Sequence, residues 1–449
     1  MRVRTIVVAS TLVGGSLVGM LAANLATRSG SLAGAQPKRL ALGNATRAHG
    51  ASRSARSAAS KKGSSGGSMG WGTSATNPTV ATTLPPVWGA ECMNNTGIAP
   101  SESQAVAQAR RFNIIVANAW MYRSYVSRMR AANPNLKMYV YLIGTFAMKD
   151  SGTAYPSDWY AHDANGNKVR SVGFANYLMD ISNPDWTREV VSRCKILLAS
   201  SHYGNGCFLD TMGTAPLEPG YMTGMPVNPK TNQVWTKDDW LSATTKIGQA
   251  VEKAIGTSHT MGNGVATGGK YYATGGGATS RILNGMTGSM VELFLRAPGA
   301  AVTSHQSESQ WLQEIQMLRD SAAKGKQLFT MTKVWTTATQ QQKDSWHRFA
   351  LSSFLLGYTP GLDWFSFRYD HGPTFDHPYW DVRIGNPVGG YQRFHGAYQR
   401  SFTNGKVIVD PTGSAVRVPI SGSYVTLEGR RVSGSITLQP HTGEVLRRA

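Results

Sequence analysis

The sequence predicts an α/β protein, a (β/α)8 TIM barrel followed by a small C-terminal antiparallel β-domain. Residues 85–394 contain eight short apolar runs, each continuous rather than alternating with polar residues, as expected for strands buried on both faces. Segments with helical periodicity separate these runs, and the runs extend from residue 87 to residue 369, a length comparable to the ~250 residues typical of such a barrel. From residue 395 onward, short β-rich runs and turn signals replace this pattern.

The eight apolar runs are the expected barrel strands. They lie at residues 87–93, 112–120, 137–144, 206–212, 259–266, 288–295, 327–335 and 362–369. A doubly wound open sheet is the alternative, but it would usually place a glycine-rich phosphate turn after its first strand. The segment "ECMNNTGIAP" that follows the first run is not such a turn. The barrel is therefore the preferred fold.

The segments between the runs carry apolar residues at the i, i+3, i+4 spacing of amphipathic helices. The first, "SESQAVAQARR", opens with a Ser and a nearby Glu that suit an N-terminal cap. Later helices are expected within residues 184–200, 237–256, 307–325 and 340–357, and several of them end in glycine. The segment "YYATGGGATSRILNG", between the fifth and sixth runs, is too rich in glycine to predict a helix.

Residues 395–449 predict the β-domain. The runs "KVIVDP", "AVRVPI", "SYVTL" and "SITLQP" are separated by hairpin signals such as "TNGK" and "EGRR". We expect this β-domain to pack on the barrel.

The N-terminal region predicts export. Residues 1–26 read as two arginines, an apolar stretch and small residues, which is the pattern of a cleaved signal. An uncleaved anchor is the alternative, because the apolar stretch approaches the ~20 residues that span a bilayer. Residues 27–84 are rich in Ser, Ala, Gly and Arg, so they predict a disordered basic linker. We therefore expect a protein that is secreted or associated with the membrane or cell envelope through its N-terminus.

The net charge of +20 does not indicate a nucleic-acid partner. Residues 1–70 contain ten Lys or Arg and no acidic residue, so half of the excess belongs to the N-terminal tail. The rest of the chain is mildly basic and has no dense Lys/Arg run.

The three cysteines cannot all pair within one chain, and Cys194 with Cys207, on adjacent elements, is the expected disulfide. Their spacing suggests no zinc site.

Polar residues at the ends of the runs are the candidate functional residues, because a TIM barrel has its active site at the carboxyl ends of its strands. Asp210 and Glu292 are flanked by apolar residues on both sides, where an unused carboxylate would be costly. The remaining candidates are one residue in the connection after the third run, Asp180, and four residues in later runs, Asn263, Lys333, Trp335 and Asp363.

Several of these candidates also have a purely structural interpretation. Asp180 precedes a helix and is as well suited to capping it as to touching a ligand. Asn263, within "GNG", could simply form a turn. Lys333 could have no role other than neutralising neighbouring acids. Asp363 stands at the start of its run, so a structural role at the opposite end of the barrel is the alternative.

Two carboxylates at strand ends are typical of glycoside hydrolysis, in which one is nucleophile or base and the other protonates the leaving oxygen. The acidic and histidine-rich loop at residues 368–381 suggests a sugar contact. A metal-dependent phosphodiesterase is the alternative, although the spacing of its histidines and aspartates matches no tight ligand motif. Motifs of serine hydrolases, zinc proteases, NTPases and dinucleotide enzymes are missing from suitable contexts.

The segments "SDWYAHDANGNKV", "YLMDISNPDW", "GCFLDTMG" and "SMVELF", together with the C-terminal tail, resemble a hypothetical glycosyl-hydrolase-like TIM-barrel family of exported bacterial proteins. That family looks related to the α-galactosidase-type glycosidase superfamily, and the resemblance runs from about residue 85 to the C-terminus. It implies a fourth-strand nucleophile and a sixth-strand acid/base, which correspond to Asp210 and Glu292. The usual sixth-strand residue of the superfamily is aspartate, so the glutamate departs from its pattern.

We therefore predict a secreted glycoside hydrolase that cleaves a polysaccharide or oligosaccharide with Asp210 and Glu292 as its catalytic residues. Asp180, Asn263, Lys333, Trp335 and Asp363 would bind the sugar, and no metal or organic cofactor is required. The alternative function is a non-catalytic glycan-binding envelope protein on the same scaffold. The sequence does not indicate the sugar, the stereochemical outcome or the oligomeric state.

Overall fold

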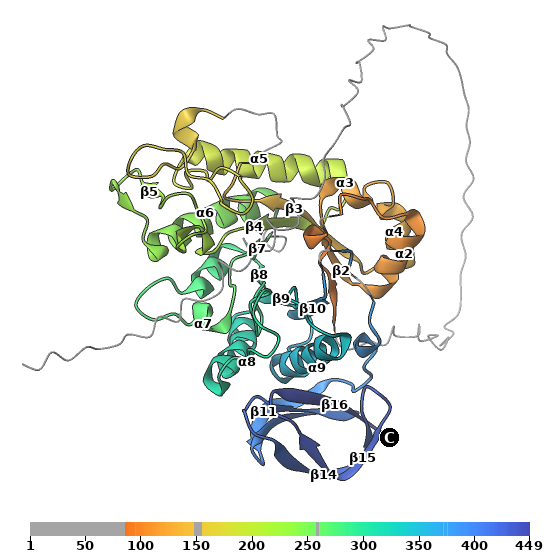
Figure 1. Ribbon diagram of the computed structural model, residues 1–449. Helices are drawn as coiled ribbons and strands as arrows, with labels where there is room; N and C mark the ends of the chain where they lie inside the picture. The colour runs from red at the N-terminus through yellow and green to blue at the C-terminus, as the bar shows by residue number, and fades with distance from the viewer. Residues whose placement is uncertain (1–85, 95, 148–154, 257–259, 371, 375) are drawn as a thin grey trace, which may run out of the picture. The chain divides into compact units, whose positions relative to one another are not determined.

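The computed structural model describes residues 86–94, 96–147, 155–256, 260–370, 372–374 and 376–449 (Figure 1). The predicted export segment at 1–26 and the linker at 27–84 lie outside these ranges. Among the helices within them, none combines the length and the apolar character needed to cross a membrane.

Eight parallel strands form the barrel and occur in the order β1-β2-β3-β4-β7-β8-β9-β10. Their bounds are β1 Trp88–Gly89, β2 Ile114–Ala117, β3 Lys137–Ile143, β4 Gly206–Asp210, β7 Thr260–Asn263, β8 Gly288–Val291, β9 Gln327–Lys333 and β10 Asp363–Arg368. A parallel bridge between Val87 and Phe365 joins the first strand to the last. The prediction of a TIM barrel is confirmed, and each of the eight apolar runs contains one strand.

The helices of the barrel follow its strands and cover its outside (Figure 1). They are α2 Glu102–Arg111, α3 Ala119–Tyr122, α4 Val126–Ala132, α5 Pro184–Ser201, α6 Lys237–Ile255, α7 Gly268–Tyr271, α8 Glu308–Ala323 and α9 Gln340–Gly357. Three of them begin with a capping box, at Ser101, Ser307 and Thr339, in which the hydroxyl accepts from one backbone amide and a glutamine returns the bond.

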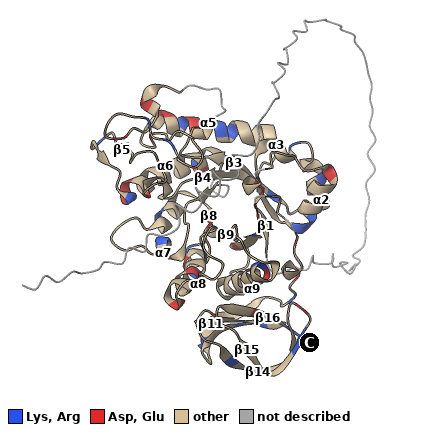
Figure 2. Cartoon of the chain, viewed as in Figure 1, with Lys and Arg blue, Asp and Glu red and all other residues tan. Residues whose placement is uncertain are grey.

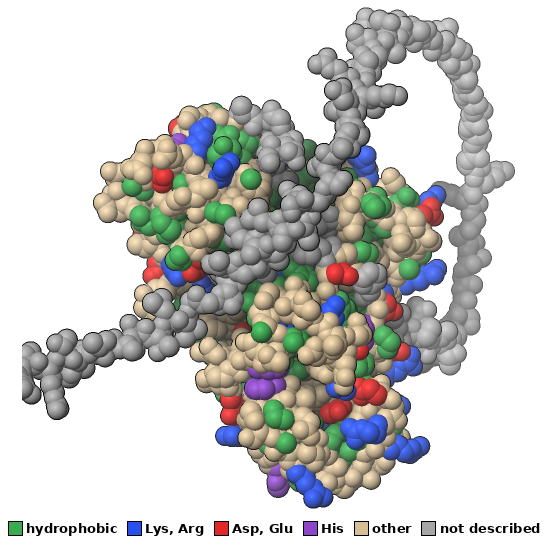
Figure 3. Space-filling model, in the orientation of Figure 1, with side chains coloured by type: hydrophobic (Ala, Val, Ile, Leu, Met, Phe, Trp, Pro, Cys, Tyr) green, Lys and Arg blue, Asp and Glu red, His purple; other side chains and the backbone are tan. Residues whose placement is uncertain are grey.

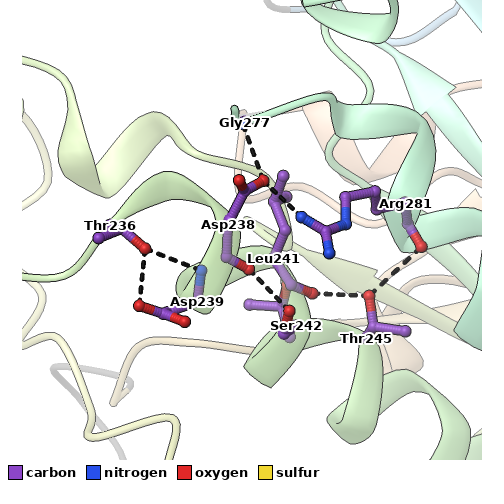
Figure 4. A network of polar contacts seen from close by, with 9 residues as sticks. Thr236, Asp238, Asp239, Leu241, Ser242, Thr245, Gly277 and Arg281 are labelled. Atoms are coloured by element: carbon purple, nitrogen blue, oxygen red, sulfur yellow. Dashed lines mark hydrogen bonds and ion pairs between the residues drawn. The ribbon is translucent and has the colours of Figure 1, made fainter. Parts of the chain in front are cut away.

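The connection between β7 and β8 contains only the short α7 and the 3-10 helix η4 (Thr279–Gly285). Three consecutive glycines with positive φ, Gly275 to Gly277, explain why no long helix forms there. Figure 4 shows how this connection is tied to α6: the Asp238 carboxylate accepts hydrogen bonds from the Gly277 amide at 2.9 Å and the Arg281 guanidinium at 2.5 Å. Asp238, near the start of α6, therefore satisfies two donors of this connection.

Other short elements occur in the loops at the barrel ends. They are the 3-10 helices η1 Glu91–Met93, η2 Ser157–Trp159, η3 Ala215–Leu217 and η5 Pro378–Trp380, and the hairpin of β5 Val227–Asn228 with β6 Gln233–Val234.

The core of the barrel has two layers, because neighbouring side chains of a strand point to opposite faces. Ile115 and Leu209 belong to a large cluster that also includes buried helix residues, so they face the helices. A separate cluster contains no helix residue of α2 to α9 and fills the barrel interior; its buried members are Trp88, Ala90, Cys92, Ile114, Val116, Tyr139, Phe208, Met261, Met290, Phe329 and Met331. Burying a side chain such as Phe208 contributes about 1.5–3 kcal/mol.

The predicted disulfide is present. Cys194 of α5 and Cys207 of β4 are bonded, with Cα atoms 6.1 Å apart, and the bond fixes this helix to the strand that ends at Asp210. Cys92 is buried and unpaired.

The β-domain is one antiparallel sheet with strand order β11-β12-β13-β16-β14-β15. Its strands are β11 Pro387–Phe394, β12 Ala397–Phe402, β13 Gly405–Asp410, β14 Val416–Val425, β15 Arg431–Leu438 and β16 Thr442–Arg448. The sheet thus begins at Pro387, before the boundary predicted at residue 395. The sequence pattern did not reveal β11, because this strand is largely exposed and lacks an apolar run. Arg400 of β12 donates to the carbonyl oxygens of Leu355, Leu356 and Tyr358 at the end of α9. This cation satisfies carbonyls that the helix end leaves without partners.

Figure 2 shows Lys and Arg residues interspersed with Asp and Glu along the described chain, and Figure 3 shows side chains of both signs on the face in view.

Candidate active site

The strand pattern brings polar side chains into the barrel interior at its carboxyl end. Phe208 of β4 lies in the interior cluster, so Asp210, two residues later, points to the same face. Asn263 follows the interior residue Met261 of β7 in the same way. The spacing recurs in the pairs Met290 and Glu292, Met331 and Lys333, and Tyr139 and Tyr141. In each of these five strands, an interior apolar or aromatic residue is therefore followed two positions later by a polar residue at the barrel mouth.

Asn263 lies between the two predicted catalytic carboxylates. Its Nδ2 donates hydrogen bonds to Asp210 Oδ1 at 2.8 Å and to Glu292 Oε2 at 2.7 Å. The two acceptor oxygens can therefore be no farther apart than the sum of these lengths. Two acceptors on one side of the amide also fix its orientation, since only the NH2 group can donate to both.

Asp210 accepts two further hydrogen bonds. The Tyr141 hydroxyl donates to Oδ2 at 2.5 Å, and the Thr211 backbone amide donates to Oδ1 at 2.8 Å. Burial raises the pKa of Asp210, the negative charge of Glu292 adds to this effect, and the three donors oppose it. Burial likewise raises the pKa of Tyr141 well above its usual value, and the neighbouring Asp210 adds to the shift, so the phenol remains a donor.

Glu292 has a different environment, because a buried cation contacts it. Lys333 Nζ forms an ion pair with Glu292 Oε1, and the lysine side chain is 2% exposed while that of Glu292 is 29% exposed. Burial acts to raise the pKa of Glu292, but the charge and hydrogen bond of Lys333, with the hydrogen bond from Asn263, lower it overall. Lys333 thus neutralises Glu292, as one of the sequence interpretations held, and does so inside the candidate site.

Trp335 extends this site along the connection after β9. The Lys333 ammonium lies 4.5 Å from the centroid of the Trp335 ring, within the range of a cation–π contact. The indole Nε1 donates to the Asp370 carbonyl oxygen at 3.0 Å, which fixes the ring, and the side chain is half-buried. A fixed and partly exposed indole beside the carboxylates is a suitable surface for a sugar ring.

Asp363 does not belong to this site, and its prediction as a sugar-binding residue is wrong. It is the first residue of β10 and pairs with Leu328, whereas the mouth is marked by the pair Arg368 and Lys333 at the other end of these strands. Five residues at ~3.3 Å each separate Asp363 from Arg368. The carboxylate is fully buried and accepts from the Thr359 amide at 2.7 Å, so its role is structural.

Asp180 forms a local turn. Its Oδ1 accepts hydrogen bonds from the amide and the hydroxyl of Ser182, at 2.9 and 2.8 Å, two residues before α5 begins at Pro184. Asn183, rather than Asp180, is the helix cap, since its side chain accepts from the Asp185 amide. The capping role that the sequence suggested for Asp180 is therefore wrong, and its role in sugar binding stays a prediction.

The described part of the loop at 368–381 uses its polar groups within the protein. Asp370 accepts from the Gly372 amide at 2.8 Å, and Asp376 pairs with Arg111 at 2.5 Å. His377 accepts from the Tyr379 amide at 3.1 Å. His371 lies outside the described residues. Within the portion of the chain that the structure describes, no cluster of three or more His, Cys, Asp or Glu could hold a metal ion.

Sequence reasoning missed several residues at the mouth. Tyr141 lies inside the third apolar run and was not among the sequence candidates, although it stands two residues after the interior residue Tyr139. Arg368 is 3% exposed and donates to the Ala90 carbonyl at 3.1 Å and the Thr374 hydroxyl at 2.8 Å. Cys92 lies near the pair, since Asp210 contributes, after burial, to raising the pKa of its thiol. Counting alternate positions from the strand ends would have found Tyr141 and Arg368.

The fold defines a TIM-barrel protein with two carboxylates at the carboxyl ends of its strands. The model of hypothetical glycosyl hydrolase family 15 matches residues 130–406, and the chain belongs to this family. The family predicted from the sequence motifs is confirmed. A comparison with curated proteins finds no match.

Solved structures similar to the chain include several glycosidases. The noncanonic maltogenic α-amylase AmyB of Thermotoga neapolitana is 10% identical, with a TM-score of 0.46 over 81% of this chain and 98% of that one. An α-amylase of Malbranchea cinnamomea is 11% identical, with a TM-score of 0.43 over 82% and 95%. The GH36 α-galactosidase AgaA of Geobacillus stearothermophilus is 9% identical, with a TM-score of 0.41 over 82% and 56%.

Proposed function

We propose that the protein is a secreted glycoside hydrolase that retains the anomeric configuration, with Asp210 as nucleophile and Glu292 as acid/base. The observation that supports this proposal is the Asn263 bridge, which limits the separation of the two carboxylate oxygens to the sum of 2.8 and 2.7 Å. Carboxyl groups of retaining glycosidases lie ~5–5.5 Å apart, whereas inverting enzymes need at least ~6.5 Å to admit a water. The two bridged oxygens lie within the distance typical of retaining enzymes, which supports retention.

The proposed reaction has two steps. Asp210 attacks the anomeric carbon and forms a glycosyl ester while Glu292 gives its proton to the leaving glycosidic oxygen. Glu292 then takes a proton from a water that attacks the same carbon and releases Asp210. The hydrogen bonds from Tyr141, Thr211 and Asn263 stabilise Asp210 as the anion that attack and release require.

Glu292 must carry a proton in the first step, yet Lys333 stabilises its ionised form in the free protein. We propose that a sugar hydroxyl draws the ammonium of Lys333 away from Glu292 when substrate binds. The carboxyl would then lose the charge that lowers its pKa, and burial beneath the substrate would favour its protonated form. Lys333 would thus couple substrate binding to the protonation of the acid.

The proposed function is tested with a panel of aryl glycosides and neutral oligosaccharides, followed by NMR of the first-formed anomer. We expect retention of configuration, and an inverted product would refute the mechanism. Asp210→Gly with azide should yield a glycosyl azide of inverted configuration, because azide replaces the nucleophile. Glu292→Gly with azide should yield the retained azide. An exchange of these two outcomes would reverse the assigned roles.

A non-catalytic glycan-binding protein is the second candidate, and the Lys333–Glu292 ion pair is the observation that favours it. A glutamate that stayed ionised in the complex could not donate a proton. Saturable glycan binding without release of reducing ends, in wild type and Lys333→Met alike, would support it.

Secretion is part of our proposal, supported by the export pattern at 1–26 and by the disulfide, which persists in oxidising compartments.

A further inference from the structure

A groove of about 590 Å³ lies away from the carboxylate pair, between the start of α9 and the turn that leads into β16. Its volume is within the ~300–1,000 Å³ of typical ligand pockets. One wall contains Gln341, Ser345 and Trp346 of α9 with His305 of the preceding connection, and the other contains His441 and Thr442.

The groove is uncharged and combines polar groups with the apolar side chains of Val302, Trp346 and Pro440. Its lining includes amides, hydroxyls and imidazoles, and no Asp, Glu, Lys or Arg among the described residues. The His305 ring stacks between His441, at 4.1 Å, and Trp346, at 4.4 Å. Burial lowers the pKa of His305 to about 4 and lowers that of His441, so both rings are neutral at pH 7. Such a lining suits a neutral ligand with many hydroxyl groups.

The groove is connected to the candidate active site through two loops. The connection from β8 to α8 starts at Glu292 and contains His305. The connection from β9 to α9 contains Trp335 and leads to the first turn of α9, where Gln341 lies. The Trp335 amide donates to the Pro298 carbonyl at 3.1 Å and joins the two loops.

Ring contacts continue this path to the groove wall. The Arg296 guanidinium, on the first of these loops, lies 4.5 Å from the centroid of the Trp346 ring. Trp346 in turn stacks on His305. The groove wall is therefore continuous with the loops that hold Glu292 and Trp335.

We propose that this groove is a second carbohydrate-binding site, which holds the distal part of a neutral oligosaccharide chain whose scissile bond lies at Asp210 and Glu292. The proposal rests on the proposed glycosidase function. A chain that leaves the mouth past Trp335 follows the two connected loops and reaches the groove at the start of α9. Hydrogen bonds from the amides and hydroxyls of the groove then hold the chain.

Two variants test the proposal. Ser345→Leu replaces a hydroxyl of the groove by an apolar side chain that occupies part of its volume. His441→Asn removes the imidazole at a residue with a φ of +53°, a conformation that asparagine tolerates well. Thr437→Leu, an exposed hydroxyl-to-leucine change on β15 outside the groove, is the matched control.

The readout is the ratio of kcat/KM for a neutral hexasaccharide to that for the aryl monoglycoside of the same sugar. Maltohexaose, isomaltohexaose and mannohexaose are the probes, with hexagalacturonate as the acidic comparison. We expect Ser345→Leu and His441→Asn to lower the ratio about tenfold, the equivalent of one or two hydrogen bonds. Aryl glycoside turnover should not change, and Thr437→Leu should match wild type. An unchanged ratio, or an equal fall for both substrates, would overturn the proposal.

Equilibrium dialysis of the same hexasaccharides separates this proposal from the proposed function. If the wild type cleaves no glycoside, the proposed function fails. Binding that Ser345→Leu weakens would still support the groove as a carbohydrate site. Binding that this variant leaves unchanged, no binding to wild type, or equal binding of hexagalacturonate would overturn it.

Discussion

Replacing Asn263 by alanine removes the amide that bridges the two carboxylates. A hydrogen bond to a charged acceptor contributes about 1.5–3 kcal/mol to stability, and Asn263 makes two such bonds. Two carboxylates ~5 Å apart also repel each other by about 3 kcal/mol at an effective dielectric constant of ~20. Water that enters from the mouth will replace part of the lost bonding. We therefore expect the lower limit, a loss of about 3 kcal/mol in the free energy of unfolding at pH 7.

The pH dependence of this loss identifies its cause. Hydrogen bonds from Asn263 lower the pKa of Asp210 and of Glu292, so they stabilise the ionised forms. Their contribution is present where the folded carboxyls are ionised and disappears as the pH falls through the folded pKa values of Asp210 and Glu292. Urea unfolding should therefore show a large difference in the free energy of unfolding between Asn263→Ala and wild type at pH 7, and a small difference at pH 3.

Asn133→Ala is the matched control for this experiment. The Asn133 amide donates to the backbone carbonyl oxygens of Ala109 and Phe112, at 2.9 and 3.3 Å, and these acceptors do not titrate. Its loss of stability should be the same at both pH values. An equal loss for Asn263→Ala at pH 7 and pH 3, or no loss at pH 7, would refute the proposed bridge between two ionised carboxylates.

Three further changes have distinct expected outcomes. Lys333→Met removes the charge that lowers the pKa of Glu292, so the alkaline limb of the kcat/KM profile should move to higher pH; an unmoved limb would contradict the role of the ion pair. Tyr141→Phe removes a donor that lowers the pKa of Asp210, so only the acidic limb should move to higher pH. Burial raises the pKa of Asp363 well above its usual value, so wild-type stability falls as the pH rises above the unfolded pKa of ~4. Thermal unfolding should therefore show Asp363→Asn gaining on wild type from pH 4 to pH 8, and a constant difference would show that burial of the charge is not the cause.

The barrel could be predicted because its strands are buried on both faces, which produces continuous apolar runs. The β-domain boundary could not be placed correctly, because β11 is an exposed edge strand with a burial pattern unlike that of the runs. The glycine triplet at 275–277 left this segment without a helix prediction, and the three residues adopt positive φ values that a helix does not accommodate. Where burial or backbone conformation shapes the local composition, the sequence was informative.

The site was predicted less completely, because a residue near a strand end is not always at the mouth. Asp210 and Asn263 end their strands and face the interior, whereas Asp363 begins its strand at the other end of the barrel. Tyr141 was not a candidate, because a tyrosine inside an apolar run has the pattern of a core residue; its ring packs against the interior cluster while its hydroxyl reaches Asp210. One further constraint separates these cases: a mouth residue must have the same parity as the interior apolar residues and must follow them along the strand. Asp363 precedes every interior residue of β10 and lacks their parity, so the rule excludes it once Trp364 is assigned to the interior.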